Sequence, residues 1–133
     1  MRLALAGGGT GGHLSPGLAL LDYLRGRGKL SAGLFLTVRR SAFDPRKSYP
    51  FCRWVFIASR PRPKRFWEWP IMPAGNVSGY LRSLAELKKF RPDVVLGLGG
   101  FVSVPPLMAA RTLGIPVVIH EQNTVLGRAN RLF

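Results

Sequence analysis

The sequence of 133 residues contains few acidic side chains and almost no cysteine. Six Asp and Glu stand against twenty Lys and Arg, and Cys52 is the single cysteine. One cysteine excludes an internal disulfide and a multi-cysteine metal site, and it fits a reducing compartment. The acidic residues form no Asp-x-Asp pair, so we expect no metal site and no metal cofactor.

Long hydrophobic runs are also missing. The uncharged stretch at residues 94–110 has 17 residues and includes three glycines and two prolines. A membrane-spanning helix needs about 20 predominantly apolar residues, so we expect a strand, a turn and a helix there instead. The apolar run at residues 3–6 is too short for the core of a signal peptide.

What the sequence does contain is positive charge and enough apolar material for a core. The formal net charge is +14, and 47% of the residues are hydrophobic. Such a charge predicts attraction to anions, which include phosphorylated small molecules, nucleic acid and anionic membranes. Arginine dominates the basic residues, and its planar fork suits bidentate contact with phosphate.

Short apolar runs alternate with amphipathic stretches along the chain. We expect strands at residues 3–6, 33–38, 53–57, 94–98 and 115–120. A Ser15 N-cap with Pro16 predicts the start of a first helix, in which Leu14, Leu18, Leu21 and Leu24 have helical spacing and which Gly26 and Gly28 end. A second helix is marked by Val77, Leu81, Leu84 and Leu87 and ends at Pro92, and a third lies between Pro105-Pro106 and Gly114.

This alternation predicts an α/β fold with a parallel, Rossmann-like sheet flanked by helices. A last helical stripe at Leu126, Ala129, Leu132 and Phe133 runs to the end of the sequence. We therefore expect residues 1–133 to be the N-terminal domain of a two-domain protein, with its second domain outside this chain.

The first candidate site is the glycine-rich stretch GGGTGGH at residues 7–13. It follows a strand and precedes a helix, so open backbone N–H groups and a helix N-terminus favour a phosphate there. The spacing of Gly7, Gly9 and Gly12 also fits a dinucleotide fingerprint. Arg39 and Arg40 follow the second strand in place of an acidic residue, which disfavours NAD and leaves NADP open.

His13 lies where this loop meets the helix. The helix N-terminus disfavours the imidazolium, so a neutral imidazole able to accept a proton from a substrate hydroxyl is expected. A histidine that only hydrogen-bonds the loop explains the spacing equally well.

Two further clusters follow later strands. The stretch GLGGFVS at residues 97–103 repeats the strand–glycine–helix pattern, and two such loops at one sheet edge could hold the two phosphates of a diphosphate. A tight packing turn is the rival interpretation. The polar cluster HEQN at residues 120–123 follows the last strand, and on the residues alone Asn123 is best explained as a helix N-cap.

Residues 39–65 contain nine bases and one acid, and three aromatic residues follow them directly. Bases beside exposed aromatics suit an anionic membrane surface and also single-stranded nucleic acid. A solvated basic loop with buried Trp rings is the third possibility. The membrane-surface candidates are Arg62, Lys64, Arg65, Phe66, Trp67 and Trp69.

Three blocks of the sequence closely resemble the MurG family of bacterial glycosyltransferases. They are GGTGGH with PGLA at residues 8–19, PDVVLGLGGFVS at residues 92–103, and GIPVVIHEQN at residues 114–123. This family transfers N-acetylglucosamine (GlcNAc) from UDP-GlcNAc to lipid I, an undecaprenyl-diphosphate-linked acceptor, and so forms lipid II for peptidoglycan. The resemblance implies the N-terminal, acceptor-side half of a GT-B fold, whose UDP-binding half would be the C-terminal domain.

The resemblance also implies roles for particular residues. Thr10, Gly11, Gly12 and Asn123 match positions that contact UDP-GlcNAc, which reverses the N-cap interpretation of Asn123. His13 matches a histidine proposed to activate the acceptor hydroxyl. The acceptor diphosphate would lie on the two glycine loops, at Gly9, Gly11, Gly12, Gly99, Gly100 and Ser103.

The expected function is therefore that of an inverting, metal-independent hexosyltransferase, attached peripherally to the cytoplasmic face of the bacterial membrane. We expect no turnover from the chain alone, because half of the cleft would be missing. Two alternatives remain: an NADP-dependent oxidoreductase domain, and a polyanion- or nucleic-acid-binding module, although no nucleic-acid partner is expected. The stretch Val104-Pro105-Pro106 departs from the Gly-Pro of many relatives.

Overall fold

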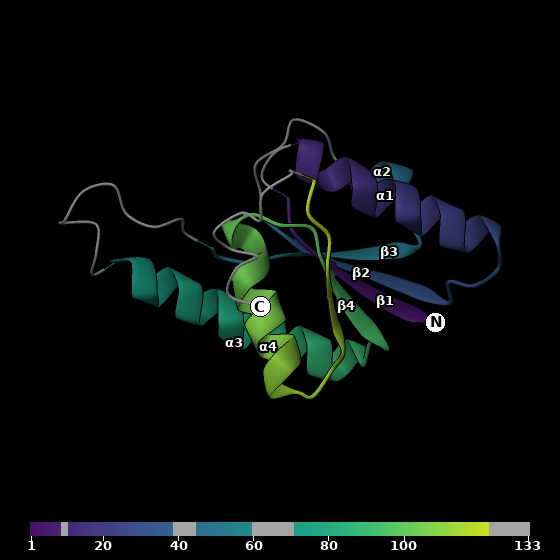
Figure 1. The fold of residues 1–133 in the computed structure, drawn as a ribbon. Coiled ribbons are helices and arrows are strands. Elements are labelled where there is room, and N and C mark those ends of the chain that lie inside the picture. The colour runs from purple at the N-terminus through teal and green to yellow at the C-terminus, as the bar shows by residue number, and fades with distance from the viewer. Residues whose placement is uncertain (9–10, 39–44, 60–70, 123–133) are drawn as a thin grey trace.

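The centre of the computed structural model, which describes residues 1–8, 11–38, 45–59 and 71–122, is a five-stranded parallel sheet (Figure 1). The strand order is β3-β2-β1-β4-β5. The strands are β1 (Arg2–Ala6), β2 (Ala32–Thr37), β3 (Cys52–Phe56), β4 (Val94–Gly97) and β5 (Val117–Ile119). This order, with the direction of winding reversed beside β1, confirms the predicted Rossmann-like α/β fold.

Helices cover both faces of the sheet. Figure 1 shows α1 (Gly11–Gly26), with the short α2 (Pro45–Ser48) beside it, on one side of the sheet. On the other side lie α3 (Ile71–Phe90) and α4 (Val104–Thr112), which pack against each other; the short 3-10 helix η2 (Phe101–Ser103) leads into α4. Right-handed crossovers between parallel strands produce this three-layer arrangement.

The core under α1 is built from large side chains. Leu5, Leu21 and Phe35 are completely buried there. The Phe35 ring stacks on Trp54 of the edge strand β3, with ring centroids 4.6 Å apart. The predicted apolar stripe of α1 is confirmed, because its other members, Leu14, Leu18 and Leu24, pack partly buried against the same cluster.

The core under α3 and α4 uses smaller side chains from the central strand. Alternation along β1 turns Ala4 and Ala6 toward these helices, where both are completely buried. Small residues let the helices lie close to the sheet: a Cβ on Gly97 would lie only 2.7 Å from Leu107 Cδ1. The small residues of the central strands thus leave room for large side chains of the helices, such as Leu107.

Two helices end on glycines in the left-handed conformation. After α1, Gly28 has φ +65°, its N–H donates to Arg25 O, and Lys29 N–H donates to Leu24 O. Gly114 has φ +67° and ends α4 with the same pair of bonds. Both predicted glycine stops are thus confirmed as Schellman motifs.

The predicted start of α1 is wrong. The helix begins at Gly11, so Ser15 is not its N-cap and Pro16 lies inside the helix. Proline lacks an N–H, so the carbonyl four residues earlier, that of Gly12, receives no helical bond from it. The glycine-rich loop therefore passes into the helix about one turn earlier than the Ser-Pro pair indicates.

Half of the apolar stripe marked on α3 does not face the core. Leu87 is buried and Leu84 partly so, but Val77 is 54% and Leu81 is 56% exposed. In the part of α3 around these two residues, the buried side is formed by the small residues Gly79 and Ser83. No helix among the described residues is long and apolar enough to cross a membrane.

Candidate functional site

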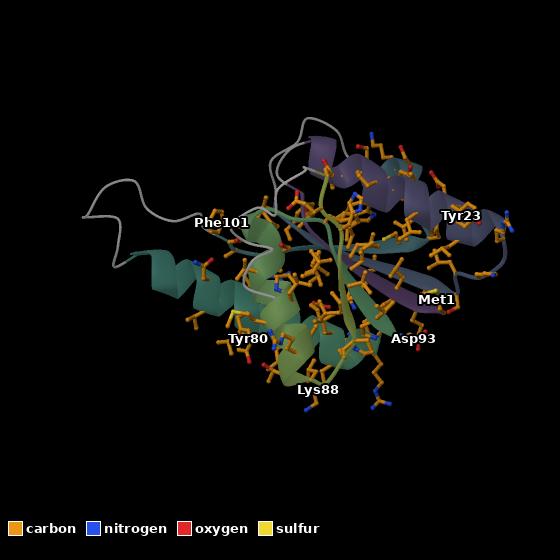
Figure 2. All side chains as sticks on the ribbon, viewed as in Figure 1. Met1, Tyr23, Tyr80, Lys88, Asp93 and Phe101 are labelled. Atoms are coloured by element: carbon orange, nitrogen blue, oxygen red, sulfur yellow. The ribbon has the colours of Figure 1, made fainter. Side chains whose placement is uncertain are left out.

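The loops that leave the carboxyl ends of the strands meet at one edge of the sheet. Strand-like hydrogen bonds continue past the strand ends: Gly7 N–H donates to Leu36 O, and Leu98 N–H donates to Ala6 O. Figure 2 shows Phe101 at this edge, while Met1 and Asp93 lie at the opposite end of the sheet. Ligands of open α/β sheets bind at the carboxyl edge, beside the strand where the winding reverses.

The two glycine loops lie side by side at this edge. A Cβ on Gly7 would lie 2.8 Å from Leu98 Cβ and 3.5 Å from Gly99 O. A Cβ on Gly100 would have Gly8 O as its nearest neighbour, at 4.0 Å. The structure therefore brings together the two loops that the sequence predicts to share one diphosphate.

At the start of the first loop, packing alone accounts for the glycines. Gly8 has φ +104°, and a Cβ there would lie 2.5 Å from Thr37 Oγ1 and 3.2 Å from Leu14 Cδ2. Gly17, in the second turn of α1, would place a Cβ 2.5 Å from Leu98 Cδ1. Gly7, Gly8 and Gly17 thus let the loop and α1 approach β2 and β4, so close packing explains these three glycines.

The rest of the first loop is only partly described. Gly11, Gly12 and His13 form the first turn of α1, so their backbone N–H groups belong to a helix N-terminus. Gly9 and Thr10 lie outside the described residues, as does the side chain of His13. The predicted roles of these residues in donor and acceptor binding and in proton transfer remain predictions.

The second loop has a different geometry, because it leaves space on its open side. Gly99 and Gly100 are consecutive residues with φ +86° and +74°. No described atom lies closer than 4.0 Å to a Cβ on Gly100. Packing therefore does not explain why residue 100 is a glycine. Its left-handed backbone conformation does, and the space in front of it is open.

Ser103 is placed differently from what a direct ligand contact requires. Its side chain is completely buried, and its hydroxyl donates to Gly100 O at 2.7 Å. Phe101, two residues earlier, exposes 37% of its surface at the same edge. The hydroxyl of Ser103 therefore fixes the Gly100 carbonyl from the buried side of the loop.

The third predicted cluster follows β5 at the same edge. His120 N–H donates to Gly97 O at 2.8 Å, which ties the end of β5 to β4 just before the second glycine loop. Gln122 N–H donates to Glu121 Oε1 at 3.0 Å. Asn123 lies outside the described residues, so its predicted contact with the donor sugar remains a prediction.

The membrane-surface candidates all lie outside the described residues, as do Arg39 and Arg40. Immediately after the basic aromatic segment comes α3, whose Val77 and Leu81 are one helical turn apart and more than half exposed. The sequence predicts both residues as members of the amphipathic stripe of this helix, whose surface is the alternative membrane-facing one. The signal that could have found them is the pair Gly79 and Ser83, which marks the opposite side of the helix as the tightly packed one.

The described part of the chain offers neither a reactive thiol nor a group of side chains suited to a metal ion. Burial raises the pKa of the Cys52 thiol to about 12, so it is not a nucleophile near neutral pH. The described residues contain no group of three His, Cys, Asp or Glu side chains that could hold a metal ion. What this edge offers is backbone N–H groups and open glycines, which suit phosphate oxygens.

Comparison with known proteins gives one consistent family. Residues 3–133 match the N-terminal domain of glycosyltransferase family 28. Among curated proteins, the UDP-N-acetylglucosamine–N-acetylmuramyl-(pentapeptide) pyrophosphoryl-undecaprenol N-acetylglucosamine transferase of Aromatoleum aromaticum is 40% identical over 131 residues. The enzyme of the same name from Geobacter sulfurreducens is 37% identical over 148 residues. These matches cover 98% and 99% of the chain but 36% of each relative, so the chain spans about a third of the relatives' length.

Solved structures agree with the sequence matches. MurG of Acinetobacter baumannii superimposes with a TM-score of 0.76 at 28% identity, over 98% of this chain and 37% of that one. The glycosyltransferase of kitacinnamycin has a TM-score of 0.60 at 22% identity, which shows the fold alone. The family match favours glycosyl transfer over the NADP-dependent oxidoreductase and the nucleic-acid-binding module. The chain belongs to glycosyltransferase family 28, of which it forms the N-terminal domain.

Proposed function

We propose that the chain is the acceptor-side domain of an enzyme that transfers GlcNAc from UDP-GlcNAc to lipid I, forming lipid II. The observation that carries the proposal is the pair of adjacent glycine loops, with open space in front of Gly100. Lipid I joins its sugar to its lipid through a diphosphate, which two neighbouring phosphate-binding loops would match. The relatives' printed name, a transferase acting on a pyrophosphoryl-undecaprenol, supports the same acceptor.

The acceptor diphosphate is proposed to bind at backbone N–H groups of both loops. Gly9, Gly11 and Gly12 would contribute from the first loop and Gly99 and Gly100 from the second, with Ser103 acting through Gly100. Such donors are fixed before the substrate arrives, so they stabilise phosphate charge without reorganisation. The helix N-terminus of α1 adds its partial positive charge.

The donor is proposed to lie between this domain and a UDP-binding C-terminal domain outside the chain. Thr10, Gly11, Gly12 and Asn123 would contact UDP-GlcNAc from the N-terminal domain. The acceptor hydroxyl attacks the anomeric carbon as the bond to UDP breaks, and UDP leaves with the electron pair, which inverts the configuration. His13, on the first turn of α1, is the proposed base that takes the hydroxyl proton.

The substrate's lipid tail requires the enzyme to work at a membrane surface. We propose peripheral attachment to the cytoplasmic leaflet through the segment of Arg62, Lys64, Arg65, Phe66, Trp67 and Trp69, extended by the exposed apolar side of α3. Support comes from Val77 and Leu81, which expose 54% and 56% of their surface beside the exposed Arg82. Bases attract anionic headgroups, while apolar side chains enter the interface.

The direct test is a transfer assay with radiolabelled UDP-GlcNAc and a soluble lipid I analogue. The complete protein should form the disaccharide product, whereas residues 1–133 alone should not. In the complete protein His13→Ala should lower kcat by about 10²–10⁴, the range for loss of a general base. A loss below threefold would leave His13 with a structural role, and no transfer by the complete protein would overturn the proposed function.

A further inference from the structure

Two serine hydroxyls donate hydrogen bonds to two consecutive carbonyl groups of the second glycine loop, those of Gly100 and Phe101. Ser103 Oγ donates to Gly100 O at 2.7 Å, and the Ser103 N–H donates to the same oxygen at 3.1 Å. Ser59 Oγ donates to Phe101 O at 2.8 Å, an oxygen that also accepts the Val104 N–H. Each carbonyl therefore receives one backbone and one hydroxyl hydrogen bond.

These bonds determine where the neighbouring N–H groups point. In a planar trans peptide the N–H of one residue points opposite to the carbonyl of the residue before it. Fixing Gly100 O thus directs the Phe101 N–H, and fixing Phe101 O directs the Val102 N–H, away from the two serines. Among the described residues neither N–H has a hydrogen-bond acceptor, and a phosphate oxygen could supply one.

The two serines come from different parts of the fold. Ser103 lies within the loop and is completely buried. Ser59 lies 42 residues before Phe101, in the segment that leaves β3. That segment is itself held at Ile57, whose N–H donates to Thr37 O at 2.8 Å. On its other side α3 approaches so closely that a Cβ on Gly79 would overlap Ala58 O.

We propose that Ser59 and Ser103 are positioning residues for the acceptor phosphate, acting through the Gly100 and Phe101 peptides without touching the ligand. The inference rests on the proposed function, because it takes the second glycine loop as part of the acceptor site. The two hydroxyl bonds, one from within the loop and one from outside it, keep its donors in one orientation. Consecutive glycines would otherwise leave those peptides many conformations to lose on binding.

The test uses the complete protein and a pair of substitutions of equal shape at one position. Ser59→Thr keeps the hydroxyl, whereas Ser59→Val replaces it with a methyl group. The KM for a soluble lipid I analogue should rise about five- to tenfold in Ser59→Val and in Ser103→Ala, and stay near the parent value in Ser59→Thr. The KM for UDP-GlcNAc should change less than twofold in all three.

A matched control separates positioning from general stability. Ser31 Oγ donates to Met1 O at 2.8 Å, the same kind of bond at the opposite edge of the sheet. Ser31→Ala should lower the melting temperature about as much as Ser59→Val and leave both KM values unchanged. Binding of inorganic pyrophosphate, measured by calorimetry, should weaken in Ser59→Val relative to Ser59→Thr.

Equal acceptor KM and equal pyrophosphate affinity in Ser59→Thr and Ser59→Val would overturn the positioning role. The Thr/Val comparison decides this even if Ser103→Ala fails to fold. If the complete protein bound pyrophosphate with the expected difference but transferred no GlcNAc, the proposed function would fail and the positioning role would stand.

Discussion

The closest backbone approach at the functional edge lies between α3 and the segment that follows β3, and Gly79→Ala perturbs it directly. A Cβ at Gly79 would overlap Ala58 O and lie 3.0 Å from the Ala58 carbonyl carbon. The segment cannot easily retreat, since Ile57 N–H and Ser59 Oγ hold it to β2 and to the second glycine loop. Moving α3 instead would strain the ion pair between Arg53 of β3 and Glu86 of α3, whose N–O distance is 2.6 Å.

Two opposing terms set the size of the effect. Alanine is a better helix former than glycine by about 1 kcal/mol, which favours the variant. Inserting a methyl group into a close-packed contact costs about 1–3 kcal/mol, and a backbone partner puts this site at the upper end. We therefore expect Gly79→Ala to lower the free energy of unfolding by about 1–2 kcal/mol, or the melting temperature by roughly 3–8 °C for a domain of this size.

Thermal and urea unfolding of residues 1–133, followed by circular dichroism, measure the effect. Gly26→Ala is the matched control, because Gly26 is the last residue of α1 and a Cβ there would meet nothing within 4 Å. This control should gain about 0.4–1 kcal/mol from the reduced freedom of the unfolded chain. If Gly79→Ala proved as stable as Gly26→Ala, the close approach of α3 to Ala58 would not exist in solution.

Two further predictions concern the surface and the buried thiol. Val77→Ser with Leu81→Ser should weaken binding to anionic vesicles about tenfold and change the melting temperature little, since both side chains are more than half exposed; Tyr23→Ser on α1, 57% exposed in the opposite layer, should leave binding unchanged. Equal binding by the double variant and the parent would remove α3 from the membrane surface. With a pKa of about 12, roughly one Cys52 thiol in ten thousand is ionised at pH 8, so a thiol reagent should label the folded chain far more slowly than the unfolded chain. Rapid labelling under native conditions would mean that Cys52 is not buried.

Much of the fold can be predicted from the sequence, because its determinants are local. Short apolar runs mark the five strands, and Gly28 and Gly114 end helices where only a left-handed residue fits. The three sequence blocks that resemble the MurG family lead to the family that the comparisons show. Two glycine loops after parallel strands could be placed at one edge, because parallel strands share their carboxyl ends.

The parts that could not be predicted depend on contacts between distant segments. Val77 and Leu81 have the spacing of a buried stripe, yet α3 turns Gly79 and Ser83 inward because the backbone at Ala58 comes too close for a larger residue. The predicted start of α1 was too late, because Ser15-Pro16 is a typical helix start whereas Gly11 and Gly12, in the observed first turn, are poor helix formers. The bond from Ser59 to Phe101 joins residues 42 positions apart, and no local pattern indicates it.

The central claim, that the second glycine loop holds the acceptor diphosphate, is tested most directly by comparing two glycines with the same backbone conformation. Gly100 and Gly114 have φ +74° and +67°, and a Cβ on either meets nothing closer than 4.0 Å, so alanine should cost each about 1–2 kcal/mol of strain. Only Gly100 lies at the proposed site. In the complete protein, the Cβ of Gly100→Ala would occupy the open space in front of the loop and keep the phosphate from its N–H groups. The KM for a soluble lipid I analogue should then rise at least about tenfold, the cost of one unmade hydrogen bond to a charged group, while Gly114→Ala leaves it unchanged. Equal acceptor KM values in the two variants would contradict the account.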